Sequence, residues 1–290
     1  MCNALTIDVE DYFHVSGFES IVDRRSWPAF ESRVAANTYR LLRLLERHGV
    51  RATFFVLGWV ARRHPQLVRE LHRAGHEIGC HSYWHRLVYR MSPREFRADL
   101  RMARQVVSEV TGSPVEAYRA PSYSITKKSL WALEVLGEEG VRYDSSIFPI
   151  HHDRYGIPQA PTHPYRIAIG QGRLWEFPPS VYRLAGVNVP VGSGGYLRLY
   201  PLSLTMRCLR GINARWRQPF VLSVHPWELD PEQPRLCGSR VSRFRHYVNL
   251  HVTEERLDRL LRLFRFGPLS GALERSMQAR GGQGRRLFAD

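Results

Sequence analysis

The chain has 290 residues, of which 43% are hydrophobic, and this composition suits a packed core and excludes a disordered chain. No stretch approaches the roughly 20 apolar residues that cross a bilayer, and the first residues lack the basic and apolar regions of a secretory signal, so we expect a cytoplasmic protein. The net charge of +15 comes from arginines spread along the chain, which argues against specific nucleic-acid binding and favours acidic or phosphate-bearing partners.

The first half of the chain alternates short apolar runs with amphipathic segments. Runs of strand length lie at 4–8, 52–58, 76–81, 117–121 and 141–146. Helices are predicted between them, at 34–47, 61–74, 93–110 and 125–139. Such alternation predicts a parallel sheet covered by helices, either a β/α barrel or a doubly wound sheet.

The second half begins with a segment of different composition. Residues 149–200 are rich in Pro, Gly and aromatic residues, and we expect long loops there, which on a rigid scaffold usually carry function. The alternation then resumes with a helix at 202–215 and a strand at 219–225, and a last amphipathic helix is predicted at 253–264.

Polar side chains follow the predicted strands at the points where they end. In a parallel β/α fold these points meet at one edge of the sheet, where functional residues gather. The residues in question are Asp8, Glu10 and Asp11 after the first strand, His81 and His85 after the third, Arg119 after the fourth, Asp144 after the fifth, and His225 after the strand at 219–225.

The two histidines of the HSYWH segment, His81 and His85, have a spacing that suits a metal. On one turn of helix this spacing would place both imidazoles on the same side, as two ligands require. Two histidines and one carboxylate, with positions left open, are typical of a catalytic metal site. A bound Zn²⁺ or similar ion lowers the pKa of water toward about 7, with Asp8 as candidate base and His225 as candidate acid. The sequence thus predicts hydrolysis of an amide or ester.

Five motifs resemble those of the NodB-type polysaccharide deacetylases (carbohydrate esterase family 4), from Leu5 to about Trp227. TIDVED stands where that family has Thr-Phe-Asp-Asp, and HSYWH matches its His-Ser/Thr-x-x-His zinc motif. YRAPS, YDSS and LSVH match its Arg-x-Pro, Asp-x-Ser-type and Leu-x-His motifs, in the family's order. TIDVEDYFHVSGFE, GGYLRL, HPWELDP and FRHYVNLHVTEERLDRLLRLFRFGPL are further similar to the subgroup associated with exosortase (PEP-CTERM) exopolysaccharide clusters.

The resemblance implies an α/β fold, a distorted barrel of about seven strands with long aromatic and Pro-rich loops. Residues 1–230 would form this barrel. Residues 231–290 would form a C-terminal helical extension that packs on it, with a frayed tail from about 281.

The resemblance also implies roles for the residues at the strand ends. His81 and His85 would bind the metal, Zn²⁺ in the first place, with Co²⁺, Ni²⁺ or Fe²⁺ as alternatives. Asp8 would be the catalytic base. The other expected roles are Arg119 orienting the base, His225 acting as the acid with the help of Asp144, and Trp175 and Trp227 lining a sugar-binding groove.

The chain departs from the family pattern at one position. The second Asp of the family motif, which directly follows the first and binds the metal, is replaced by Val9, so the ligand is either Glu10 or Asp11. Strand alternation points Asp8 and Glu10 to the same face, whereas a strand that ends at Asp8 would allow a turn to present Asp11.

Three functions fit these residues. The first is metal-dependent removal of N-acetyl groups from amino sugars of an exopolysaccharide or a lipid-linked precursor. The second is hydrolysis of another C–N bond, in a small amide, and the third is glycan binding without catalysis. Every predicted catalytic position holds a workable side chain, which favours an enzyme. The expected place of action is the cytoplasm or the inner face of the cytoplasmic membrane, where positive charge favours anionic lipid.

Overall fold

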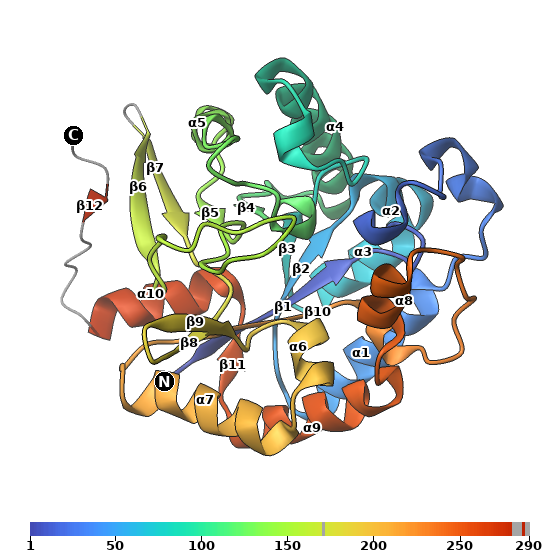
Figure 1. Ribbon diagram of the computed structural model, residues 1–290. Helices are drawn as coiled ribbons and strands as arrows, with labels where there is room; N and C mark the ends of the chain where they lie inside the picture. The colour runs from blue at the N-terminus through green and yellow to red at the C-terminus, as the bar shows by residue number, and fades with distance from the viewer. Residues whose placement is uncertain (170–171, 280–285, 288–290) are drawn as a thin grey trace.

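The structure is a computed structural model that describes residues 1–169, 172–279 and 286–287. A central sheet curls through the molecule (Figure 1). Its strands are β1 (Asn3–Val9), β2 (Thr53–Val56), β3 (Glu77–Cys80), β4 (Ala117–Tyr118), β5 (Tyr143–Asp144), β6 (Tyr165–Ile169), β7 (Gly172–Glu176), β10 (Val221–Val224), β11 (Phe266–Gly267) and β12 (Arg286–Leu287). A separate hairpin consists of β8 (Val181–Leu184) and β9 (Val187–Pro190).

The strand order identifies the fold. Seven parallel strands follow one another in the order β10-β1-β2-β3-β4-β5-β7, and β6 pairs antiparallel with β7. In the described part of the chain no pairing joins β10 to the other end of this row, so the sheet is a curled half-barrel. The α/β class and the distorted barrel expected from the sequence are confirmed.

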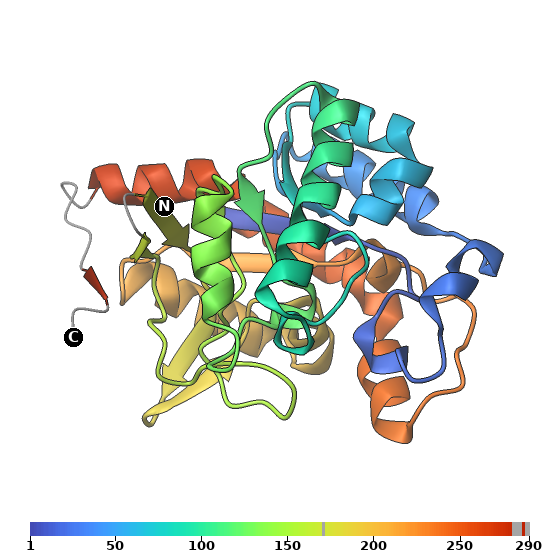
Figure 2. The ribbon, with the colours of Figure 1, turned by 90° about the horizontal axis from the view of Figure 1, so that it is seen from above.

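Helices lie on the outside of the curled sheet (Figures 1 and 2). They are α1 (Val34–Arg47), α2 (Gly58–Arg63), α3 (Pro65–Arg73), α4 (Pro93–Thr111), α5 (Trp131–Glu138), α6 (Gly194–Leu199), α7 (Leu202–Ala214), α8 (Arg240–Tyr247), α9 (Thr253–Leu263) and α10 (Leu269–Ala279). Short 3₁₀ turns are η1 (Ser16–Phe18), η2 (Arg24–Ala29), η3 (Val88–Arg90), η4 (Pro121–Tyr123), η5 (Pro226–Leu229) and η6 (Leu250–Val252). None of the helices in the described residues is long and apolar enough to span a membrane.

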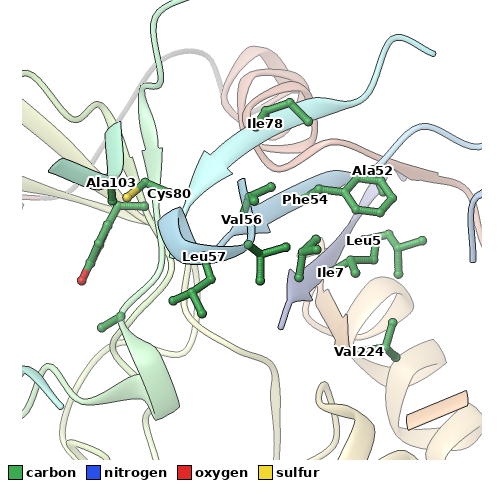
Figure 3. Close-up of a cluster of buried hydrophobic side chains, with 14 of the residues drawn as sticks. Leu5, Ile7, Ala52, Phe54, Val56, Leu57, Ile78, Cys80, Ala103 and Val224 are labelled. Atoms are coloured by element: carbon green, nitrogen blue, oxygen red, sulfur yellow. The ribbon is translucent and has the colours of Figure 1, made fainter. Parts of the chain in front are cut away.

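The first strand, β1, lies between β10 and β2, and every one of its residues is buried. Figure 3 shows Leu5 and Ile7 of β1 beside Phe54 and Val56 of β2, with Ile78 of β3 above them. Burying side chains of this size contributes about 1.5–3 kcal/mol each relative to exposure. A charge at Leu5 would therefore disrupt the pairing of β1 with its neighbours, and β1 is fixed firmly enough to carry catalytic groups at its end.

The helix predicted at 93–110 is confirmed as α4, and its ends follow local rules. The Ser92 side chain accepts from the Glu95 backbone N–H, and the Glu95 carboxylate accepts from the Ser92 N–H, which makes a capping box before Pro93. Gly112 closes the helix with φ +69°, a conformation that suits glycine. The predicted helices at 34–47, 202–215 and 253–264 are likewise present as α1, α7 and α9.

Two predicted helices differ from the structure. The segment 61–74 is broken into α2 and α3 at His64, which has ψ 57° because Pro65 follows it and disfavours the α conformation. The segment 125–139 becomes helical only at α5. Before α5 the chain makes turns in which Ser129 Oγ accepts from the Thr126 N–H.

The segment 149–200, predicted to be loops, contains β6, β7, the β8–β9 hairpin and α6. These strands are short, and both pairs, β6–β7 and β8–β9, are antiparallel, so they lack the helix-strand alternation that marks the rest of the chain. Within 231–290, β11 pairs with β1, so this extension adds a strand to the sheet itself. The division at residue 230 stays a prediction, and the predicted frayed tail lies outside the described residues apart from β12.

Candidate active site

The carboxyl ends of the parallel strands open onto a cavity of about 610 Å³. Asp8 reaches it from β1, Glu10 from the position just after β1, and His81 and His85 from the segment after β3. His225 reaches it from the end of β10, which pairs directly with β1. These five residues lie together as the strand-end pattern predicts.

Three of these side chains form a candidate metal centre. One ligand atom each from Glu10, His81 and His85 lies within 4.8 Å of the others, and all three residues are buried. His81 Nδ1 lies 2.8 Å from the Arg119 carbonyl oxygen. A carbonyl only accepts, so Nδ1 carries the proton and Nε2 keeps a free lone pair. Burial lowers the pKa of His81 to about 4, so the ring is neutral, as a ligand must be.

Glu10 holds a charge at this centre. His85 Nε2 lies 2.6 Å from Glu10 Oε2. Burial alone would raise the pKa of Glu10, but His85 and His225 outweigh it and lower this pKa well below its usual range. Among the described residues the buried His85 Nδ1 has no hydrogen-bond partner, and the His85 ring is the group that lies against Glu10 Oε2. A buried anionic carboxylate beside two imidazoles fits a cation site.

His81 and His85 are brought close together by a loop. They do not lie on the helical turn that their spacing in the sequence suggested. Ser82 and His85 have positive φ angles of 68° and 51°. Asp99 of α4 holds this loop by accepting from Ser82 Oγ at 2.5 Å and from the backbone N–H groups of Tyr83 and Trp84 at 2.8 and 3.1 Å. Asp99 was not predicted from the sequence, because nothing near it in the chain marks a polar site.

Asp11 directly follows Glu10 in the sequence, but its carboxylate makes different contacts. Its Oδ2 accepts from Ser32 Oγ and from the backbone N–H groups of Arg33 and Val34, at 2.9, 2.9 and 3.1 Å. It therefore caps the start of α1, and it is not among the residues that line the cavity. Of the two carboxylates left open by the sequence, the geometry favours Glu10, on the face that strand alternation gives it.

Asp8 is held by a fully buried arginine. Arg119 Nη1 donates to Asp8 Oδ1 at 2.9 Å and to Thr6 Oγ1 at 2.7 Å. Its other nitrogens donate to the carbonyl and the hydroxyl of Ser145 at 3.1 and 2.8 Å. With its donors taken up by fixed acceptors, Arg119 holds the Asp8 carboxylate in one position, and its expected orienting role stays a prediction.

His225 faces two sides of the site. Its Nε2 lies 3.7 Å from Asp8 Oδ2 and 3.6 Å from Glu10 Oε1, while its Nδ1 lies 3.1 Å from Glu228 Oε2. Burial alone would lower the pKa of His225, but the carboxylates of Glu228, Glu10 and Asp8 outweigh it and raise this pKa to about 9. The ring is therefore protonated near neutral pH in this arrangement.

Glu228 is a second residue of the site that was not predicted from the sequence. It is buried, its Oε1 accepts from Arg198 at 3.1 Å, and its Oε2 accepts from the His225 backbone N–H at 2.9 Å. A Cβ on Gly194 would overlap this carboxylate, so glycine is needed there. The sequence did contain a local signal for this residue. Glu228 follows His225 by three residues, with Pro226 between them, and a Glu at this spacing suggests a cap on the next helical turn.

Asp144 does not contact His225, contrary to its expected helping role. It lies fully buried at the end of β5 and accepts from Ser146 Oγ at 2.5 Å. Its other neighbour is Glu176 on β7, and burial raises the pKa of Asp144 to about 6 and that of Glu176 well above its usual range. The carboxylate beside His225 comes from Glu228 instead.

The two tryptophans expected to bind sugar differ in position. Trp227 lines the cavity but is only 5% exposed. Its ring stacks on His225 and His246, and its Nε1 donates to Glu10 at 3.2 Å. Trp175 lies on β7 against the hydrophobic cluster under α10 and is not among the residues that line the cavity. Trp227 thus supports Glu10, and neither ring offers a free face to a sugar in the cavity.

The chain matches two family models in succession. Residues 23–141 match the polysaccharide deacetylase model, and residues 145–274 match a domain of unknown function, DUF3473. A peptidoglycan-N-acetylglucosamine deacetylase of Bacillus cereus is 32% identical over 98 residues, 33% of this chain and 36% of that protein. PgdA of Listeria monocytogenes, a protein of the same description, is 33% identical over 88 residues, 30% of this chain and 19% of that protein. The chain thus spans about a third or less of these relatives.

Solved structures agree with the fold. A candidate polysaccharide deacetylase from Mycobacterium smegmatis has a TM-score of 0.63 at 23% identity, over 99% of this chain and 93% of that one. The Puue allantoinase has a TM-score of 0.60 at 14% identity, over 97% and 91%. These likenesses establish the curled α/β sheet alone. The likeness in sequence to polysaccharide deacetylases covers residues 23–141 of this chain.

Proposed function

We propose that this protein is a metal-dependent deacetylase that removes N-acetyl groups from amino sugars of an exopolysaccharide or its precursor. One observation carries the proposal: a base, an acid and a metal-ligand set line a single cavity. These groups are Asp8, His225, and the trio Glu10, His81 and His85. Relatives named as N-acetylglucosamine deacetylases make an N-acetylated glucosamine the first substrate to test.

Glu10, His81 and His85 would hold the divalent ion. Two imidazoles and one carboxylate leave positions open for water and substrate, and this ligand set suits Zn²⁺, with Co²⁺, Ni²⁺ or Fe²⁺ as alternatives. The ion supplies acidity to a water molecule and polarises the acetyl carbonyl. Trp227 Nε1, which donates to Glu10 Oε1, would fix the direction of this carboxylate.

Asp8 would act as the base. Its Oδ1 is held by Arg119, while its Oδ2 faces the cavity near His225 and is free to take a proton from the attacking water. Removal of that proton lets the oxygen attack the acetyl carbon.

His225 would act as the acid. Protonated at Nε2, it would give this proton to the amide nitrogen as the C–N bond breaks, which releases acetate and leaves a free amine on the sugar. Glu228, on the Nδ1 side, orients the ring and favours its charged form.

The finer parts of the proposal concern substrate and place. We propose a polysaccharide of the exosortase-associated kind, or its lipid-linked precursor, as substrate, because the motif likeness extends over nearly the whole chain. We also propose action in the cytoplasm, with peripheral attachment to the inner face of the membrane as the alternative, since a charge of +15 favours anionic lipid.

The test is acetate release from N-acetylglucosamine oligomers by metal-loaded protein, with and without chelator, with metal content measured by mass spectrometry on the same sample. We expect release that stops with chelator and returns with Zn²⁺. Bound metal without acetate release from any N-acetyl sugar would move the function to another C–N bond. Failure to take up metal at all would favour glycan binding without catalysis.

A further inference from the structure

The outer part of the cavity differs in charge from its floor. At the floor, Asp8 is paired with Arg119 and Glu228 with Arg198, so these charges are compensated within the protein. The outer wall is formed by the segment after β1, the segment after β5, and α8. Figure 2 shows the blue segment after β1 beside the orange α8, although they are far apart in sequence.

Two guanidinium groups of this outer wall have no acidic partner in the described part of the chain. They belong to Arg154, whose Nε is buried without a hydrogen-bond acceptor, and to Arg240, which is exposed at the start of α8. The adjacent carboxylate of Asp153 is already taken by Arg245 at 3.2 Å and His152 at 3.0 Å. An unpaired, partly desolvated guanidinium that faces a cavity is a strong donor to an anion.

Gly17 leaves room beside Arg154. A Cβ on Gly17 would lie 3.7 Å from both Arg154 Nη1 and Ser242 Oγ, so this guanidinium and this hydroxyl flank the same point of the cavity wall. The φ of Gly17 lies outside the left-handed region, so the backbone does not require glycine there. Because Gly17 has no side chain, open space remains between the Arg154 guanidinium and the Ser242 hydroxyl.

We infer that the outer cavity binds an acidic substituent of the glycan, a carboxylate or a phosphate, beside Gly17 and against Arg154 and Arg240. This inference rests on the proposed function, because it assumes that the N-acetyl group of the same molecule lies at the floor. It assigns the substrate to the acidic N-acetylated glycans, either an acidic polymer or a phosphate-ended precursor. A carboxylate or phosphate accepts from a guanidinium through two oxygens, which gives both affinity and orientation.

The experiment compares three probes of equal length by titration calorimetry. They are a neutral N-acetylglucosamine oligomer, an oligomer in which N-acetylglucosamine alternates with glucuronic acid, and an N-acetylglucosamine oligomer that ends in a 1-phosphate. We expect at least one acidic probe to bind about tenfold more tightly than the neutral one, the size of a charged hydrogen bond. The probe that gains affinity tells a carboxylate substrate from a phosphate-ended one.

Three variants localise the effect. Arg154→Gln and Gly17→Ala are both expected to abolish the preference for the acidic probe and leave binding of the neutral one unchanged. Gly17→Ala also covers the case in which Arg154→Gln folds poorly. Arg142→Gln is the matched control, because Arg142 is an exposed arginine paired with Glu116 outside the cavity, and it is expected to keep the preference.

Equal affinity of the wild type for all three probes would overturn the inference. The inference would also be overturned if Arg142→Gln lost the preference for the acidic probe as fully as Arg154→Gln does. The preference would then come from the overall positive charge of the protein. Acetate release is measured on the same samples. Acid-selective binding without acetate release would overturn the deacetylase function and still support the anion site, so the two failures are distinguishable.

Discussion

At the scale of single residues, buried charges at the cavity floor are satisfied in pairs. Asp8 faces Arg119 and Glu228 faces Arg198, and both arginines are almost fully buried. Removal of one member leaves its partner as an uncompensated buried charge, which typically costs about 3–5 kcal/mol of folding stability. Conservative replacements that keep the shape are therefore the useful probes of this site.

The first prediction separates metal binding from proton transfer. His81→Ala is expected to lose both metal and activity, because it removes one of three ligands. Asp8→Asn is expected to keep the metal and lose about 10²–10⁴-fold in kcat, the usual contribution of a positioned base. Asp11→Asn is the control, a buried carboxyl on the same segment that caps α1, and it is expected to keep its metal. Metal retained in His81→Ala, or full turnover in Asp8→Asn, would contradict the assignment.

The second prediction concerns Glu228. Glu228→Gln keeps the size of the side chain but removes the negative charge beside His225 Nδ1. We expect kcat to fall by up to about 10²-fold with little change in KM, because the acid is affected and the substrate contacts are not. Glu228→Asp, which restores the charge, is expected to recover part of the lost kcat. If both variants changed KM alone, or if Asp gave no recovery, Glu228 would have only a packing role.

Many residues of the cavity floor could be predicted from the sequence. Each of them follows an apolar run of strand length, and the carboxyl ends of parallel strands lie at the same edge of a sheet. Asp8, His81 and His225 are of this kind. The choice between Glu10 and Asp11 depends on whether the strand continues beyond Asp8, and β1 continues through Val9. Glu228 was missed because its partner Arg198 lies thirty residues away on α6, a contact that no local pattern encodes.

At the scale of elements, the ends of β5 and β7 hold two carboxyl groups together. Asp144 and Glu176 are direct neighbours in the strand pairing, and neither Asp144 Oδ2 nor Glu176 Oε2 has a hydrogen-bond donor within the described residues. One proton shared between these oxygens would satisfy both. Burial raises the pKa of each group, so the folded protein keeps a proton that the unfolded chain releases above about pH 4.5.

The third prediction follows from that proton. Because the folded state binds more protons than the unfolded state, the free energy of unfolding contributed by this pair is greatest below pH 4.5 and is lost as pH rises through 6. In Glu176→Gln the amide donates to Asp144, so the proton is no longer needed. We expect the fall in Tm between pH 5 and pH 8 to be smaller in this variant than in the wild type. An identical fall in both would exclude the shared proton.

Element boundaries were predictable where local chemistry sets them and not elsewhere. The capping box at Ser92 and Glu95 fixes the start of α4, whereas Pro65 divides a helix that hydrophobic spacing alone makes continuous. The short strands of 165–190 were missed because they pair antiparallel with close neighbours and do not alternate with helices.

At the scale of the whole molecule, the site needs both halves of the chain. The first matched family segment contains His81, His85 and Arg119, and the second contains His225 and Glu228. The strand β10 of the second segment pairs with β1, the strand that carries Asp8. Neither segment holds a complete set of base, acid and ligands.

The fourth prediction is that a fragment of residues 1–141 does not fold on its own. It lacks β10, so one edge of the fully buried β1 would be exposed to water. We expect no cooperative thermal transition and no zinc uptake from the fragment, measured by circular dichroism and mass spectrometry. Mixing it with a fragment of residues 142–290 is expected to restore both. A fragment that melts cooperatively alone would show two independent units.

The boundary between the two family models falls at β5, where Tyr143 and Asp144 lie in the gap between residues 141 and 145. That strand is inside the sheet, between β4 and β7. Recombination that replaced one half by an unrelated partner would therefore cut a sheet at an interior strand and separate the acid from its metal ligands. We expect the two halves to be inherited together, and genomes to contain them as one gene.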